Sequence, residues 1–452
     1  MTVKALMPVR KVNLVAPLAH KVTDMHTTDT AASAQAWSGA ASTLIGFGLR
    51  DGGVVRAMGT PPMPGIATST TAIRTTTTRA TRARLLPSAD PLLFENLVQA
   101  YLDCRRTKRN SASAQAFEAM AEHNLYQLYE ELKEGTYQPG ASICFVITHP
   151  TPREVWAARF RDRIGHHLLY NHIAPRYHAS FVADSCACIP GRGTLYAARR
   201  LEHQVRSQTQ NWSRPAHYLK CDLANFFVSI DKTVVLGQLA RKVTEPWWMS
   251  LATVILIHDP RQNVEVRGTR QELSLVPPHK RLFNAPDGHG LPIGNLSSQF
   301  FANVLLNDLD QFAKHQLRAP HYVRYVDDFV LLHESPQWLN HAKQQIEGKL
   351  ADLHLALNPR KTILQSVARG IEFVGQVIKP WRRITRRKSL NVALDRLSTM
   401  PSADLHQSGN SYFGLLRQAT HSHADRALVA NLLLDRGHVV NGKLTKTFRK
   451  KT

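Results

Sequence analysis

The sequence predicts a mixed α+β protein that begins with a segment lacking regular structure. Residues 323–332 hold two β-prone apolar runs on either side of Asp327 and Asp328, which predicts a β-hairpin with both carboxylates at its turn. Residues 91–133 carry apolar side chains at helical spacing. Hydrophobic residues make up 43% of the 452, so the chain can bury a sizeable core and hold more than one domain.

The composition points to a polyanionic partner. Lys and Arg number 57 against 34 Asp and Glu, a formal net charge of +23. Such an excess is typical of proteins that neutralise the phosphates of an extended nucleic acid, although a basic protein bound to an acidic protein would look alike. The 5 cysteines are scattered and lack the spacing of a zinc site, which favours reduced thiols in a cytoplasmic protein. We expect no contact with a membrane, because no apolar run is long enough for a transmembrane helix.

Residues 1–88 differ in composition from the rest of the chain. They are rich in Thr, Ala, Ser and Gly and show no sustained periodicity. We therefore predict a disordered, weakly basic extension. The alternatives are an arm that docks on RNA or a partner, and a start codon assigned too far upstream.

After the extension the pattern becomes regular. We predict helices over residues 91–102 and 111–133 with a basic loop, Arg105 to Arg109, between them. A strand over residues 143–148 and a helix through residues 166–178 follow. Further helices are predicted over residues 338–353 and 389–436, and the end of the chain from Lys443 is expected to fray.

A third carboxylate belongs with the Asp327-Asp328 pair. Residues 218–222 read as a short strand that ends in Asp222, followed by the aromatic pair Phe226-Phe227. Three carboxylates on two strand ends could hold two Mg²⁺ ions about 3.5–4 Å apart, with Mn²⁺ as an alternative. Taken alone, an Asp-Asp pair could also be a solvated turn. Asp231 is expected to cap the next helix rather than bind metal.

These motifs resemble the reverse transcriptases. Tyr325-Val326-Asp327-Asp328 matches their palm hairpin, and Asp222 with Phe227 matches their first palm motif. The resemblance covers roughly residues 90–436 and implies a right-hand polymerase fold. Its parts would be fingers (89–215), a palm (216–378) with a polar insertion (259–289), and a short helical thumb with a basic tail (379–452). It also implies an RNA-directed DNA polymerase that uses template RNA, a DNA or RNA primer, and deoxynucleoside triphosphates.

The resemblance also implies roles for single residues. Arg153 and Arg161 would bind the incoming triphosphate, since guanidinium groups bind phosphate oxygens in pairs. Phe227 would pack under the ribose and exclude a 2′-hydroxyl, whereas Phe226 is expected in the core. Lys361 could protonate the leaving pyrophosphate, or simply be a solvated lysine in a basic loop. By the same resemblance, residues 185–194 would lie near the template strand and residues 370–375 would form the strand pair that grips the primer.

One segment suggests a subgroup of the family. Ile293-Gly294 and Ser298-Gln299 stand where reverse transcriptases commonly have Gln-Gly and Ser-Pro, and we expect Gly294 to start a helix. This variant resembles the enzymes of diversity-generating retroelements and the related antiphage-defence enzymes, which make DNA that is templated by non-coding RNA, repetitive or untemplated. The loss of an amide at Ile293 implies looser base selection.

The resemblance to the enzymes of diversity-generating retroelements implies a bacterial or phage-encoded protein that works with a structured template RNA. It also implies a small basic accessory protein, with a homo-oligomer as an alternative. Two further hypotheses stay open. One is a catalytically inactive RNA-binding scaffold, against which the three intact carboxylates argue. The other is a template-independent nucleotidyl transferase.

Overall fold

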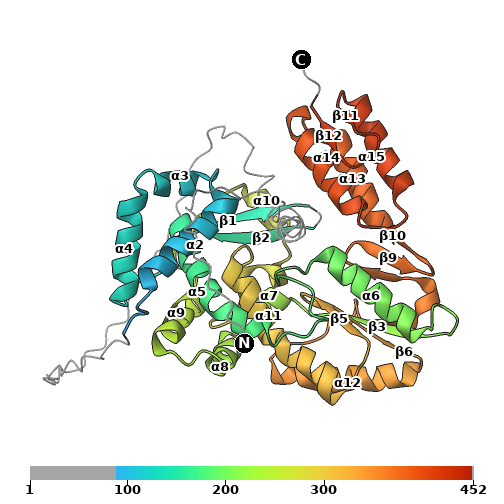
Figure 1. Ribbon diagram of the computed structural model, residues 1–452, viewed down its shortest axis with the longest axis horizontal. Coiled ribbons are helices and arrows are strands. Elements are labelled where there is room, and N and C mark those ends of the chain that lie inside the picture. Colours follow the sequence, from blue (N-terminus) through green and yellow to red (C-terminus); the bar gives the residue numbers. More distant parts are fainter. Residues whose placement is uncertain (1–87, 150, 450–452) are drawn as a thin grey trace, which may run out of the picture.

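The computed structural model describes residues 88–149 and 151–449, which form three groups of elements along the chain (Figure 1). The predicted extension of residues 1–88 therefore lies almost wholly outside the described residues. The described part combines helices with mostly antiparallel strands, so the predicted α+β class is confirmed. No helix of the described residues is long and apolar enough to cross a membrane.

The N-terminal group consists of helices that pack on one another, together with a β-hairpin. Its elements are α2 (Leu93–Lys108), α3 (Ala112–Glu118), α4 (Ala121–Lys133), β1 (Ser142–Ile147), β2 (Arg153–Ala158) and α5 (Phe160–His178). The prediction of a basic loop from Arg105 to Arg109 is wrong, because α2 continues to Lys108. Arg and Lys are good helix formers, and their positive charges are favourable at a helix C-terminus. The helix predicted over residues 111–133 is interrupted at Met120, which has a φ of −137°.

The polar insertion adds to this first group instead of forming an open loop. It contains β4 (Val264–Val266), α10 (Arg270–Ser274) and two short 3-10 turns, η1 (Pro278–Lys280) and η2 (Leu282–Asn284). β4 pairs in parallel with β1 and extends the hairpin to three strands in the order β2-β1-β4. Leu282 packs with Trp156 in a small buried cluster, so the insertion and the hairpin share a core.

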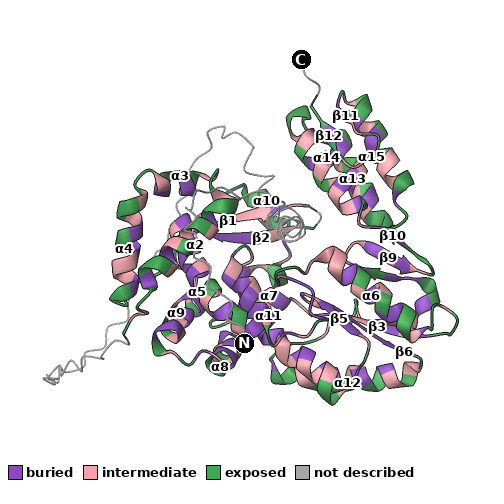
Figure 2. Cartoon of the chain, in the orientation of Figure 1, coloured by how far each residue is buried: buried purple, intermediate pink, exposed green. Residues whose placement is uncertain are grey.

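The second group is built on a four-stranded antiparallel sheet of order β5-β6-β3-β7. Its strands are β3 (His217–Asp222), β5 (Tyr322–Tyr325), β6 (Asp328–His333) and β7 (Ile363–Ser366). Alternate side chains face opposite sides. Leu219 and Leu331 pack into the core that contains α12 (Pro336–Asp352), whereas Tyr218 and Leu332 pack into the core that contains α6 (Thr194–Gln208). The two helices thus cover the two faces of the sheet, whose strands are coloured largely as buried in Figure 2.

Further helices join the sheet to the N-terminal group. They are α7 (Phe226–Ser229), α8 (Lys232–Ala240), α9 (Pro246–Ile257), α11 (Leu296–Gln311) and the π-helical turn η3 (Phe312–Gln316). α11 is almost entirely buried and packs against α5 and α8. Asp231 accepts a hydrogen bond from the Thr233 N–H at 2.7 Å, so its predicted role as the cap of α8 is confirmed.

The third group is a small sheet followed by a helical bundle. Its elements are β8 (Ile371–Phe373), β9 (Gln376–Lys379), β10 (Arg382–Thr385), α13 (Arg387–Thr399), α14 (Ser402–Leu416), α15 (His423–Asp435), β11 (Val439–Val440) and β12 (Thr447–Phe448). The bundle has a core of its own, centred on Leu397, Phe413 and Leu433. The expected fraying from Lys443 is wrong, because Thr447 pairs with Val440 and buries its side chain.

Candidate active site

Three carboxylates meet where two neighbouring strands of the central sheet end. Asp222 is the last residue of β3 and lies directly opposite Asp328, the first residue of β6. Asp327 occupies the turn before Asp328, and its carbonyl accepts a hydrogen bond from the Leu223 N–H at 3.3 Å. The predicted hairpin is confirmed, with the difference that Asp328 already belongs to the strand.

Burial and neighbouring negative charge raise the pKa of Asp327 and of Asp328. Burial, together with the negative charges of Asp328 and Asp222, raises the pKa of Asp327 to about 7. Burial also raises the pKa of Asp328, with Lys220 acting in the opposite direction and Asp222 adding to the rise. Clustered carboxylate oxygens are the ligands that Mg²⁺ prefers, so the chemistry of these groups fits that ion. Among the residues that the structure describes, no group of three or more His, Cys, Asp or Glu side chains is arranged so that it could hold a metal ion.

Lys361 supplies a positive charge to this cluster. Its Nζ lies 2.9 Å from both carboxylate oxygens of Asp222. Burial alone would lower the pKa of Lys361, but the hydrogen bond to Asp222 and the nearby carboxylates outweigh it and raise that pKa. Asn358 from the same loop donates its backbone N–H to the Asp222 carbonyl at 2.7 Å and its side-chain N–H to Oδ1 at 3.2 Å. The loop therefore holds Asp222 from two sides.

A buried arginine supports the turn that carries Asp327. Arg324 is fully buried and forms a two-pronged ion pair with Asp310 of α11, with both N···O distances at 2.7 Å. It also donates to the Val326 carbonyl at 3.0 Å, the Asn303 Oδ1 at 3.2 Å and the Ser185 Oγ at 2.8 Å. Val326 has a φ of +56°, a left-handed conformation that a β-branched residue rarely adopts. Arg324 thus fixes the carbonyl of a strained residue next to a catalytic candidate.

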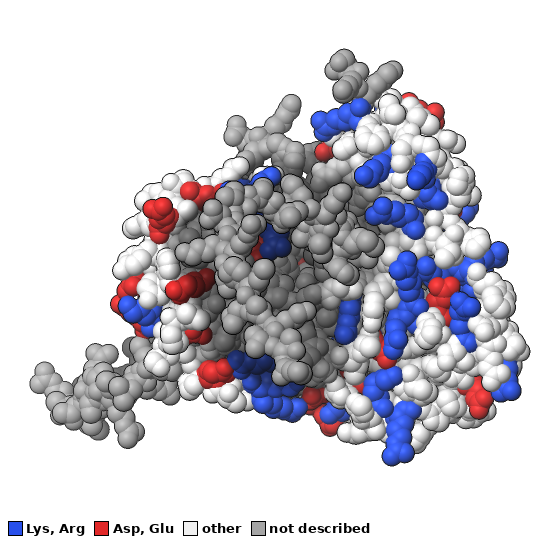
Figure 3. All heavy atoms as spheres, in the orientation of Figure 1, with Lys and Arg blue, Asp and Glu red and all other residues white. Residues whose placement is uncertain are grey.

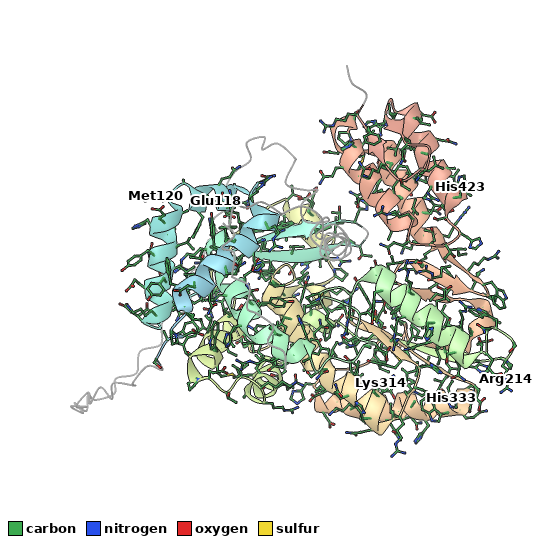
Figure 4. The ribbon with its side chains drawn as sticks, viewed as in Figure 1. Glu118, Met120, Arg214, Lys314, His333 and His423 are labelled. Carbon is green, nitrogen blue, oxygen red and sulfur yellow. The ribbon has the colours of Figure 1, made fainter. Side chains whose placement is uncertain are left out.

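The same arginine connects the turn to the glycine-rich segment. The Arg324 N–H donates to the Asp184 carbonyl, and the Cys186 N–H donates to the Arg324 carbonyl, both at 2.9 Å. Asp184 is in turn held by Arg200 of α6 at 2.5 Å and by Lys314 at 3.0 Å; Lys314 is labelled near α12 in Figure 4. Residues 184–186 therefore run along β5 and are hydrogen-bonded to the strand that leads into the Asp327 turn.

Phe227 lies one short turn beyond Asp222. Asn225 takes a left-handed φ of +48°, and this reverses the chain so that α7 begins at Phe226. Phe226 is buried, as predicted for a core residue, whereas Phe227 remains partly exposed with its ring 5.2 Å from that of Phe226. The Phe227 carbonyl accepts a hydrogen bond from the Leu291 N–H at 2.8 Å, which joins α7 to the segment before Ile293.

The Ile293-Gly294 segment lies against β2. The Ile293 carbonyl accepts a hydrogen bond from the Trp156 N–H at 2.7 Å, and Asn295 Oδ1 accepts one from the Ala158 N–H at 3.0 Å. Gly294 has a φ of +128°, and a methyl group there would lie 2.9 Å from Val155 Cγ1. The expectation that Gly294 starts a helix is wrong, because α11 begins at Leu296 after extended Asn295.

Of the remaining residues predicted to bind the nucleotide, Arg153 lies near the carboxylates and Arg161 does not. Burial lowers the pKa of Arg153, while the opposite charge of Asp327 raises it, so Arg153 lies within electrostatic reach of the carboxylates. Gln299 is half-buried on α11. The structure does not bring Arg161 into this group: its guanidinium binds Glu131 of α4 and also Asp162, the latter at 3.2 Å.

Sequence reasoning assigned no role to Arg324 or Asn358. Arg324 directly precedes the Tyr325-Val326-Asp327-Asp328 motif, and an arginine between apolar strand residues was the available signal that it is buried with a partner. Asn358 lies in the Leu357 to Thr362 loop that carries Lys361.

Comparisons with known proteins indicate the family of the central part of the chain. The family model described as "Reverse transcriptase (RNA-dependent DNA polymerase)" matches residues 158–378, a range that includes the three carboxylates and Lys361. The chain is also similar to Protein YkfC of Escherichia coli (strain K12), with 22% identity over 324 residues that cover 64% of this chain and 78% of that protein. Residues 158–378 therefore form a reverse transcriptase domain, and this domain indicates an RNA-directed DNA polymerase.

Proposed function

We propose that this polymerase copies RNA into DNA by two-metal phosphoryl transfer at Asp222, Asp327 and Asp328. The observation that carries the proposal is the meeting of these carboxylates at adjacent strand ends, with Lys361 as their nearest cation. In this proposal residues 89–215 act as fingers, 216–378 as the palm and 379–452 as the thumb. The insertion 259–289 would work with the fingers, because β4 pairs with β1.

The carboxylates, Arg153 and Lys361 have different proposed roles in the reaction. The three carboxylates would hold two Mg²⁺ or Mn²⁺ ions, which activate the primer 3′-hydroxyl and offset charge on the leaving pyrophosphate. Arg153 would orient the triphosphate from β2. Lys361, whose pKa is raised, keeps its proton at neutral pH and would give it to the pyrophosphate after separating from Asp222.

Two proposed contacts select and bind the nucleotide. Phe227 would pack beneath the sugar and leave no space for a 2′-hydroxyl. Arg161 would join Arg153 on the triphosphate only if it leaves its ion pair with Glu131. Gly294 and Gln299 would border the nucleotide and the template from the segment beside β2.

Primer extension with the Asp327→Asn variant tests the metal assignment. We expect no incorporation of deoxynucleotides on an RNA template, because the amide cannot replace a carboxylate ligand. RNA affinity, measured by fluorescence anisotropy, should stay within about two-fold, since phosphate contacts are spread over many cations. Asp395→Asn, at an exposed carboxylate of α13, is the matched control and should leave both properties unchanged. Normal incorporation by Asp327→Asn would show that the carboxylate cluster is not the catalytic centre.

We further propose a diversity-generating type of activity, with a structured template RNA and a small basic accessory protein or a second copy of the chain as partners. The Ile293-Gly294 and Ser298-Gln299 variant supports it. An alkyl side chain at Ile293 can only pack, whereas an amide could reach the base pair and penalise poor geometry. Discrimination of about 1–3 kcal/mol per polar contact corresponds to roughly a 5- to 150-fold change in error rate.

Ile293→Gln should therefore lower misincorporation selectively, most clearly opposite template adenine. Steady-state incorporation of correct and incorrect nucleotides measures the effect. An equal fall in both rates would mean that Ile293 only packs against its neighbours, and the fidelity argument would fail.

A further inference from the structure

An exposed tryptophan stands at the turn between β9 and β10. Pro380 and Trp381 form this two-residue turn, and Trp381 is 67% exposed. No aromatic ring or cation within the described part of the chain contacts its indole. Trp381 also has a φ of +64°, the left-handed conformation that glycine and asparagine adopt most readily at such a turn. The side chain of Trp381 is therefore mostly exposed to solvent, and its backbone conformation would suit glycine or asparagine better.

Three cations lie near this turn without acidic partners in the described structure. Lys379 and Arg382 face each other across the turn. Arg369 is next to them in space, because a methyl group on its neighbour Gly370 would lie 3.2 Å from Lys379 Cγ. In the described structure none of these three side chains forms an ion pair, although the nearby Arg383 and Arg386 pair with Glu202 and Glu372.

This surface is remote from the catalytic carboxylates. The segment before Gly370 leaves the central sheet at Ser366, which pairs with His217 at the start of β3, whereas Asp222 is at its end. Five residues of strand span about 17 Å. Figure 4 labels Arg214 at this edge of the sheet, and Figure 3 shows Lys and Arg gathered over the side formed by α6, β10 and the bundle.

We propose that Trp381, together with Arg369, Lys379 and Arg382, binds single-stranded RNA outside the polymerase site. The indole stacks on an unpaired base, and the cations contact the phosphates on either side of it. This arrangement of an aromatic ring within unpaired cations is how proteins hold single strands without reading their sequence. An acidic peptide would satisfy the cations but leave the flat face of the indole without a planar partner. The inference rests on the proposed function, because copying RNA is what brings a strand to this protein.

Binding of two RNAs to the full-length protein tests the proposal. One RNA is a blunt hairpin, and the other is the same hairpin with an unpaired extension of about twelve nucleotides, a length within the single-strand sites of other proteins. Trp381→Ala should weaken binding of the extended RNA about 5- to 150-fold, which corresponds to about 1–3 kcal/mol for one stacked base, and leave the blunt hairpin unchanged. Trp381→Phe should retain most of the affinity.

The matched control is Tyr126→Ala. Tyr126 is 59% exposed on α4, one turn from Glu122 and Glu130, and its removal should not change RNA binding. Arg382→Gln should lower the salt dependence of binding to the extended RNA, by about 0.7 in the logarithmic slope. Trp381→Gly should raise the melting temperature, because glycine relieves the left-handed backbone, while weakening binding as Trp381→Ala does.

Equal affinities of Trp381→Ala and the unaltered protein for the extended RNA would overturn the proposal, whatever else this surface contacts. An equal loss in the Tyr126→Ala control would overturn it as well. Primer extension on a short template separates this result from a failure of the proposed function. Trp381→Ala should extend such a primer normally, whereas a wrong catalytic assignment would appear in Asp327→Asn and not in this binding assay.

Discussion

Replacing Arg324 by methionine should weaken both the fold and the metal-dependent step. The substitution leaves the carboxylate of Asp310, which is 0% exposed, with the Tyr322 hydroxyl as its remaining hydrogen-bond donor. Removing one partner of a buried ion pair costs about 3–5 kcal/mol. The carbonyl of Val326 loses its donor at the same time, so the strained turn that carries Asp327 is held less firmly.

A double variant separates the two effects. Arg324→Met with Asp310→Asn removes both charges and keeps an acceptor for Tyr322, so about 2 kcal/mol of the lost stability should return. The Val326 carbonyl still lacks its donor, so the Mg²⁺ concentration for half-maximal primer extension should stay raised. Denaturant unfolding and Mg²⁺ titrations of primer extension measure the two quantities. A double variant with normal Mg²⁺ dependence would refute the positioning role and leave Arg324 as a purely structural residue.

Three further changes have defined outcomes. Gly294→Ala should lower the free energy of unfolding by about 2–3 kcal/mol, because its methyl group would press on β2 at 2.9 Å; Gly191→Ala, at a φ of +74° with nothing within 4 Å, should cost only about 1 kcal/mol. Asp231→Ala should cost about 1–2 kcal/mol at pH 7. Burial alone would raise the pKa of Asp231, but hydrogen bonds from Thr233 and His354 outweigh it and lower that pKa to about 2. The stability lost in Asp231→Ala should therefore shrink as the pH falls from about 4 towards 2. An equal loss of stability at pH 7 and pH 3 would contradict this account. Phe227→Ala should admit ribonucleotides in single-nucleotide incorporation assays, and an unchanged preference for deoxynucleotides would assign the sugar gate to another residue.

The sequence was most informative where neighbours in the chain decide the structure. The hairpin at Asp327 follows from two short apolar runs around charged turn residues, and Asp222 follows from a strand that ends in a carboxylate. Arg324 could not be assigned, because its partners Asp310 and Ser185 lie on other elements, 14 and 139 residues away in the sequence. In a sequence with 57 Lys and Arg, one more cation beside a motif carries little information.

The misplaced helix start at Gly294 has a similar cause. A glycine before a helical pattern resembles a flexible helix boundary, and nothing in the neighbouring sequence shows that β2 passes within contact distance. The break at Met120 was also missed, since the apolar spacing continues across it. Both errors concern backbone geometry that tertiary contacts impose.

The contact between β2 and the segment of residues 293–295 has a mechanical consequence. Arg153 and Trp156 lie on one short strand, and the Trp156 N–H is bonded to the Ile293 carbonyl. The insertion strand β4 braces the same hairpin from its other edge. Any shift of the hairpin that carries Arg153 towards Asp327 would therefore move Ile293 with it. If Arg153 binds the triphosphate and residue 293 borders the new base pair, as proposed, substitutions in this contact should change nucleotide affinity and copying accuracy together.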